Sequence, residues 1–206
     1  MGKILGKYII TYIMPLMLIT AFAASMTGCA SGSEDYKETT VSIDKKGRIT
    51  HKIVESFDRD YYNEDELRNL IDKELSAYCS SRNDEKAAQL ASLEIKDGLA
   101  EAEIDFGSCD DYAGFNEVDF FFGTVGEATD RDYPTDVTLK SADDDSTIGK
   151  YELESLKDNR IVVVSEPVTL VLPGKIAYYT ANIDVIDKDR ARMASDSVGL
   201  GYIVLK

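Results

Sequence analysis

Cysteine and histidine, two residue types that often supply nucleophiles and bases, are scarce in this chain. Its 206 residues include three cysteines and a single histidine, His51. Any Ser-His or Cys-His mechanism would have to use His51. This residue shares strand parity with Ile49 and Ile53, and no Gly-x-Ser-x-Gly motif accompanies it, so we interpret it as structural. The sequence therefore assigns no catalytic residue, and we expect a protein that is not an enzyme.

The first cysteine belongs to a segment whose composition differs from the rest of the chain. Residues 1–28 contain two lysines, no acidic residue and an apolar run over 8–24 that ends in small side chains. The segment leads into Met26-Thr27-Gly28-Cys29. It resembles a bacterial lipoprotein precursor, in which this cysteine receives a diacylglycerol. The resemblance implies a lipoprotein signal peptide over 1–28 and covalent lipid on Cys29, with no other cofactor.

Removing 28 residues with two lysines from the chain of net charge −15 leaves 178 residues at −17. We expect a flexible tether over 29–38, followed by a single α+β extracytoplasmic domain over 39–206. An uncleaved signal anchor is the alternative, because the uncharged stretch 8–32 is long enough for a hydrocarbon core of roughly 30 Å. Either anchor places the protein at the cell membrane, on its extracytoplasmic face. The acidic excess excludes nucleic acid as a partner.

The other two cysteines, Cys79 and Cys109, are an even number in an exported chain. A disulfide between them would close a loop of about 30 residues and contribute about 3 kcal/mol. Two separate thiols are the alternative, since the sequence gives no distance.

Acidic and aromatic side chains gather at a few places. Acids cluster at 58–65 and 143–145, but neither cluster has the spacing of an EF-hand loop, so we interpret both as solvated surface and predict no metal site. Weak divalent binding from charge density stays open. Tyr61-Tyr62 and Tyr178-Tyr179 fit either core packing, which we favour, or a carbohydrate or peptide surface.

Stepping patterns give the elements that would position these residues. Apolar residues alternate on both sides of Lys45-Lys46-Gly47, which predicts a β-hairpin. Asn63 followed three residues later by Glu66 is a helix-start spacing, and it predicts an amphipathic helix over 64–80. The apolar face of that helix consists of Leu67, Leu70, Ile71, Leu75 and Tyr78.

A second hairpin-then-helix unit is indicated by a weak repeat at an offset of 51, which aligns Gly47 with Gly98. We expect short helices over 109–116 and 124–130. Between them, 117–123 fits both strand and helix patterns; its neighbouring glycines argue against a continuous helix, so we choose a strand-like link.

The last third of the chain is rich in strand patterns. Polar residues 130–150 predict a solvated loop. The whole is predicted to be α+β: an antiparallel sheet with helices on one side, two hairpin-then-helix units and a strand-rich C-terminal third. The later strands are expected at 161–164, 168–172, 176–179, 183–186 and 202–205.

Three sequence segments are similar to small lipoproteins of Clostridia-type Gram-positive bacteria: 40–47, 111–116 with Gly123-Thr124, and 202–206. This resemblance implies surface exposure and a shared fold, and it brings no activity. We therefore expect a lipid-anchored, non-enzymatic module that contacts the bilayer through its N-terminal lipid and binds an envelope protein, peptide or glycan. A solute-binding lipoprotein of a transporter is the alternative, although 178 residues are few for two lobes. An envelope hydrolase lacks any supporting motif.

Overall fold

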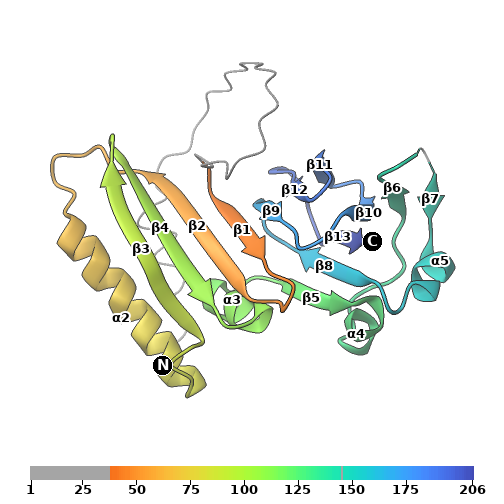
Figure 1. Cartoon of the computed structure of the whole chain (residues 1–206), viewed down its shortest axis with the longest axis horizontal. Helices are drawn as coiled ribbons and strands as arrows, with labels where there is room; N and C mark the ends of the chain where they lie inside the picture. Colours follow the sequence, from red (N-terminus) through yellow and green to blue (C-terminus); the bar gives the residue numbers. More distant parts are fainter. Residues whose placement is uncertain (1–37, 145) are drawn as a thin grey trace.

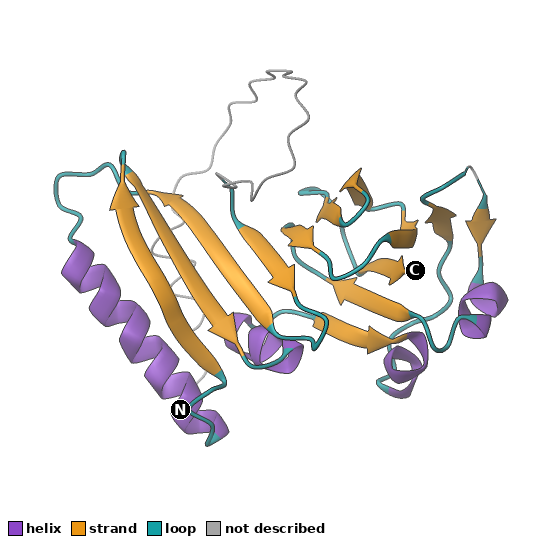
Figure 2. Cartoon of the chain, viewed as in Figure 1, coloured by secondary structure: helices purple, strands orange, loops and turns teal. Residues whose placement is uncertain are grey.

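The computed structural model describes residues 38–144 and 146–206 as a strand-rich mixed α/β fold with two sheets (Figures 1 and 2). Cys29, the predicted signal peptide and most of the predicted tether lie outside the described residues. No helix among the described residues is both long enough and apolar enough to cross a membrane. The prediction of one antiparallel sheet is wrong in two respects, because there are two sheets and one of them contains a parallel pair.

The seven-stranded sheet combines the N-terminal strands with three strands from the last third of the chain. Its strands are antiparallel except for β1 and β9, which pair in parallel. This parallel pair is where the N-terminal hairpins meet the C-terminal strands, so both parts belong to one fold. In spatial order the strands are β11 (Ile183–Asp187), β12 (Arg190–Met193), β9 (Thr169–Val171), β1 (Thr40–Ile43), β2 (Ile49–Ser56), β4 (Leu99–Phe106) and β3 (Ala88–Lys96).

The six-stranded sheet is antiparallel throughout and is buried on both faces at its centre. Val162 and Val164 point into a core shared with the other sheet, whereas Ile161 and Val163 point into a second core beneath α4 (Val125–Asp130) and α5 (Lys150–Ser155). Burial on both faces explains why residues 161–164 of β8 (Arg160–Val164) form an uninterrupted apolar run. The strand order is β5 (Phe120–Thr124), β8 (Arg160–Val164), β13 (Gly201–Leu205), β10 (Ile176–Thr180), β6 (Leu139–Ser141) and β7 (Thr147–Ile148).

Both predicted turns of the N-terminal half are present. Gly47 lies between β1 and β2 with φ +81°, and Gly98 lies between β3 and β4 with φ +76°. A positive φ is cheap only for a residue without a Cβ, so these two glycines define the hairpins.

Helix α2 (Glu64–Arg82) confirms the predicted helix and extends it by two residues. The Asn63 side chain accepts a hydrogen bond from Glu66 N at 3.1 Å and so caps its first turn. Ile71 and Leu75 are buried against β3, which orients the helix along that strand.

Residues 109–130 follow the predicted sequence of short elements. Helix α3 (Cys109–Asn116) has the predicted bounds, β5 replaces the strand-like link from Phe120 on, and α4 begins after Thr124. Thr124 and Glu127 form a reciprocal capping box, with hydrogen bonds of 2.7 and 3.1 Å.

The solvated loop predicted over 130–150 is wrong in part, because it contains β6 and β7. Leu139 is fully buried in the second core, and its strand pairs with β10. A single buried leucine among polar residues gives no periodic signal, which is why the sequence pattern missed the strand.

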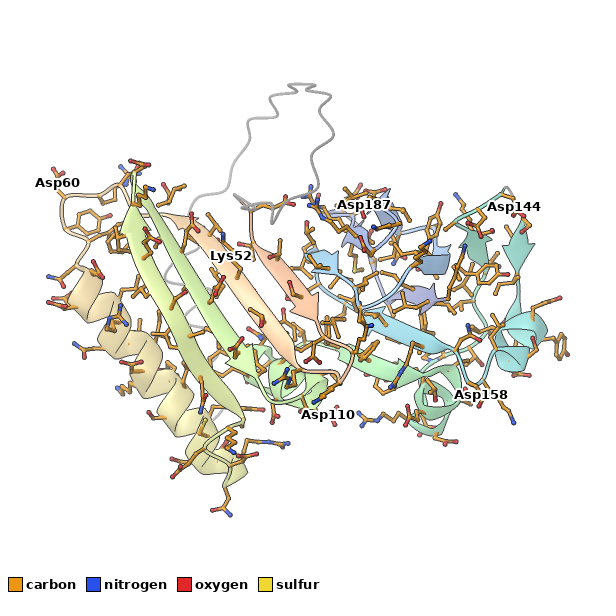
Figure 3. All side chains as sticks on the ribbon, viewed as in Figure 1. Lys52, Asp60, Asp110, Asp144, Asp158 and Asp187 are labelled. Carbon is orange, nitrogen blue, oxygen red and sulfur yellow. The ribbon has the colours of Figure 1, made fainter. Side chains whose placement is uncertain are left out.

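One face of the seven-stranded sheet stays polar. Lys52 pairs with Glu101 at 2.9 Å across β2 and β4, and Thr50 donates to Asp105 at 2.6 Å. Figure 3 labels Lys52 on this face. The opposite face carries the apolar residues of the core.

Candidate ligand-binding groove

Three segments meet at one end of the seven-stranded sheet: the end of β2, the β3–β4 turn and the start of α2. Phe57 N donates to Gly98 O at 2.7 Å and so ties the chain after β2 to that turn. Tyr62 N donates to Arg59 O at 2.9 Å, which folds the loop back toward the helix start. Figure 3 shows Asp60 at the outer tip of this loop. The short loop therefore holds its aromatic residues beside the first turns of α2.

The rings of this loop pack on one another and stay open to solvent. Phe57 and Tyr62 lie with ring centroids 4.9 Å apart, and Tyr61 meets Tyr62 edge-on at 5.0 Å. Tyr61 is 77% exposed, Tyr62 41% and Leu70 of α2 39%. Exposed apolar side chains that adjoin one another, rather than lying singly, mark binding surfaces.

These side chains border a groove of about 470 Å³, which we call the aromatic groove. Its apolar lining consists of Phe57, Tyr61, Tyr62, Leu67, Leu70 and Ala100, and its acidic lining of Glu55 and Glu66. Burial raises the pKa of the Glu55 carboxyl above its usual range. The groove thus combines aromatic faces with two acceptor groups, an arrangement that can stack on a ligand and hydrogen-bond to it.

The two tyrosine pairs differ in their surroundings. Tyr178 and Tyr179 are half-buried and pack against the two cores, which confirms the packing interpretation for that pair. For Tyr61 and Tyr62 the packing interpretation is wrong, because both rings are exposed.

The helical spacing predicts Leu70 on the apolar face of α2, and in the structure this residue lines the groove. Leu67, Ile71 and Leu75 follow at steps of four, and Leu70 lies directly before Ile71. The extra apolar residue beside the stripe is the signal that would have pointed to this surface.

The side chain of His51 in β2 is buried, in agreement with its strand parity. Its ring meets Tyr112 edge-on at 5.3 Å, and burial lowers its pKa to about 4. Tyr112 Oη donates to Glu166 Oε1 at 2.6 Å. Burial raises the pKa of both Tyr112 and Glu166. The three residues form a cluster inside the shared core, away from the aromatic groove.

Cys79 and Cys109 are free thiols in the structure, and the disulfide between them is not formed there. Cys79 Sγ contacts Ala88 O at 3.2 Å, whereas Cys109 Sγ contacts Phe122 O at 3.8 Å. Burial raises the pKa of the Cys109 thiol, which makes it a poor nucleophile at neutral pH.

The acidic clusters serve local structure where they are described. Asp143 pairs with Lys206 at 2.5 Å, and Asp144 accepts from Ser146 N at 2.9 Å. In the loop before α2, Asp58 lies 3.7 Å from Arg59. Across residues 38–144 and 146–206, no three His, Cys, Asp or Glu side chains are grouped so that they could hold a metal ion.

Comparisons with known protein families, with curated proteins and with solved structures found no match to this chain.

Proposed function

We propose that the protein is a lipid-anchored, extracytoplasmic binding module and that the aromatic groove is its ligand site. The single observation that carries the ligand site is the exposure of Tyr61, Tyr62 and Leu70 side by side in one groove. A folded chain gains stability by covering such side chains, so their joint exposure favours a use in binding.

The anchor is proposed from the resemblance of residues 26–29 to a lipoprotein cleavage site. The described chain begins at Glu38, whose carboxylate pairs with Arg190 at 3.6 Å and also contacts Arg192. The nine residues that follow Cys29, up to Glu38, reach about 30 Å when fully extended. A lipid on Cys29 would therefore hold the domain close to the membrane surface.

The same end of the sheet carries the groove and the start of the domain. Thr39 Oγ1 accepts from Val54 N at 3.1 Å, and Glu55 of the groove is the next residue along β2. In this proposal the groove lies on the side of the domain from which the tether leaves. We also propose that β1-β2-α2 and β3-β4-α3 are two units of one hairpin-then-helix plan.

Fatty-acid labelling tests the anchor. In a bacterial host that processes lipoproteins, the wild-type chain should incorporate a clickable fatty acid and sediment with membranes. Cys29→Ala should abolish both. Labelling that survives this substitution would contradict the lipoprotein and leave the uncleaved signal anchor.

A melting-temperature screen tests the groove. Sugars, amino acids and short peptides are added to the soluble domain, residues 38–206, and to its Tyr61→Ala variant. A ligand that raises the melting temperature of the first and not of the second supports the module. A shift that Tyr61→Ala leaves unchanged would place the ligand elsewhere, as a solute-binding lipoprotein with another pocket would require.

A further inference from the structure

The aromatic groove contains two carboxylates, those of Glu55 and Glu66. Within the described parts of the chain, neither Glu55 nor Glu66 forms an ion pair. Arg59 and Arg68, the arginines nearest in sequence, contact other acids of the loop and helix at 3.7 and 3.9 Å. Arg68 also donates to Leu93 O at 3.3 Å. Both of these arginines are thus already engaged.

Of the two carboxylates, that of Glu55 has the larger free-energy cost of being charged in the folded protein. It is half-buried at the end of β2, and burial alone raises its pKa. A carboxylate that loses water without gaining a partner is destabilised in its charged form. A cation brought into the groove would remove that cost, so the groove favours a positively charged ligand over a neutral or an acidic one.

The apolar lining of the aromatic groove favours a second property in the same ligand. Phe57 and Tyr62, whose rings pack on each other, line the groove together with Leu67, Leu70 and the buried Ala100. Such a lining gains most from covering a large apolar or aromatic side chain. The aromatic faces also attract a neighbouring ammonium or guanidinium group.

Charge narrows the class of ligand further. The chain carries a net charge of −15, and acidic residues continue around the groove at Asp58, Asp60, Glu64 and Asp65. Phosphate-rich polymers and anionic lipid surfaces are repelled by such a surface. A neutral glycan could stack on the tyrosines but would leave Glu55 without a counter-charge.

We propose that the aromatic groove binds a peptide segment of a partner protein in which a large apolar side chain is flanked by lysine or arginine. This inference rests on the proposed function, because it names the ligand class of the same site. The apolar side chain lies along Phe57, Tyr62 and Leu70. The basic side chain reaches Glu55 or Glu66.

Peptide fluorescence gives a direct test, because the chain contains no tryptophan. Three peptides share a tryptophan–leucine core and carry lysine, glutamine or glutamate on both sides. Tryptophan emission then reports the peptide alone when it is titrated with the soluble domain at about 0.15 M salt. The lysine peptide should bind roughly tenfold more tightly than the glutamine peptide, and the glutamate peptide should bind more weakly still.

Matched variants separate the groove from general attraction to an acidic protein. Tyr61→Ala should weaken binding of the lysine peptide roughly tenfold, whereas Tyr151→Ala, which removes an 81% exposed tyrosine from α5, should not. Glu55→Gln should reduce binding of the lysine peptide to the level of the glutamine peptide, and Glu154→Gln on α5 should leave it unchanged.

Three outcomes would overturn the inference. If Glu55→Gln and Glu154→Gln weaken binding of the lysine peptide equally, the peptide is attracted by the acidic protein as a whole and not by the groove. If all three peptides bind equally and Tyr61→Ala weakens each of them, the groove is a binding site but its ligand is not basic, and the proposed function survives. If Tyr61→Ala changes neither these titrations nor any shift in the melting screen, both proposals fail.

Discussion

Helix α2 borders two grooves, and the side chains that line them differ in how many contacts they already make within the protein. The aromatic groove lies at its N-terminal end. The larger groove, of about 870 Å³, lies between the C-terminal half of α2 and the first residues of β3. Volume alone would favour the larger one as the binding site. The contacts made by the lining residues favour the smaller groove instead.

The larger groove consists mainly of groups that already bond to one another. Ser80 Oγ donates to Ser76 O at 2.8 Å, Cys79 Sγ contacts Ala88 O, and Gln89 Nε2 donates to Glu85 O at 3.3 Å. A ligand there would have to break these contacts or compete with water for an open polar surface. In the aromatic groove, by contrast, a ligand would cover exposed rings and supply a partner for Glu55. Binding depends on what a surface lacks more than on its size.

Substitution of two leucines of α2 has the largest expected effect and tests whether the two grooves differ in this way. Leu75 lines the larger groove but is only 4% exposed, so its side chain belongs to the core. Leu75→Ala should lower the free energy of unfolding by about 2–5 kcal/mol. Leu70→Ala, at a 39% exposed position, should cost less than about 1 kcal/mol and should weaken peptide binding.

Urea denaturation of both variants measures the stabilities, and the peptide titration measures binding. A Leu75→Ala variant that unfolds like the wild type would show that the larger groove is not backed by the core. A Leu70→Ala variant as unstable as Leu75→Ala would show that Leu70 is a core residue. That result would contradict the proposal that Leu70 belongs to an exposed ligand site.

Local patterns were enough to predict the elements that form these grooves. The turn at Gly47, the Asn63 cap and the helix that follows all depend on residues within a few positions of each other. The pairing of β1 with β9 was not predictable in this way, because its partners are about 130 residues apart and carry no signal for each other. Strand β12 was missed for a simpler reason: its buried Ala191 and Met193 alternate with arginines over four residues only.

The groove itself was half visible in the sequence. Tyr61 and Tyr62 stand out in the sequence as a pair, but their exposure depends on how the loop after β2 folds against the β3–β4 turn. Glu55 gave no signal at all, since any of the 38 acidic residues has the same chemistry until a fold buries one of them. The sequence indicated which residue types were available, and tertiary contacts selected among them.

The core and the aromatic groove should also differ in their response to low pH. Burial lowers the His51 pKa to about 4, below its unfolded value of about 6.5. The stability that depends on neutral His51 is therefore complete above pH 6.5 and is lost as the pH falls toward 4. The loss should reach about 3 kcal/mol. Glu166 acts in the opposite direction, because its raised pKa favours the folded state as it becomes protonated.

Comparing wild type with His51→Gln isolates the histidine from the other groups. Denaturation at several pH values should show the wild type losing about 3 kcal/mol more than the variant between pH 7 and 4. The comparison across pH removes any constant cost of the substitution. Parallel curves for the two proteins would show that His51 is not buried in its neutral form. Peptide binding by folded protein should not depend on this residue.

The two ends of α2 give the smallest expected effects and the finest comparison, because an asparagine lies at each. Asn63 at the aromatic end caps the helix through its side chain, so Asn63→Ala should cost about 1 kcal/mol. Asn83 at the other end has φ +52°, a left-handed conformation that glycine adopts more easily. Asn83→Gly should therefore be neutral or slightly stabilising, by less than about 1 kcal/mol. Thermal unfolding measures both changes in stability.

The two substitutions should also differ in their effect on peptide binding. Because Asn63 orders the first turn that carries Glu66, Asn63→Ala should weaken binding of the lysine peptide. Asn83→Gly should leave that binding unchanged. Equal binding by both variants would mean that the groove does not need an ordered helix start, and the aromatic loop alone would then have to hold its ligand.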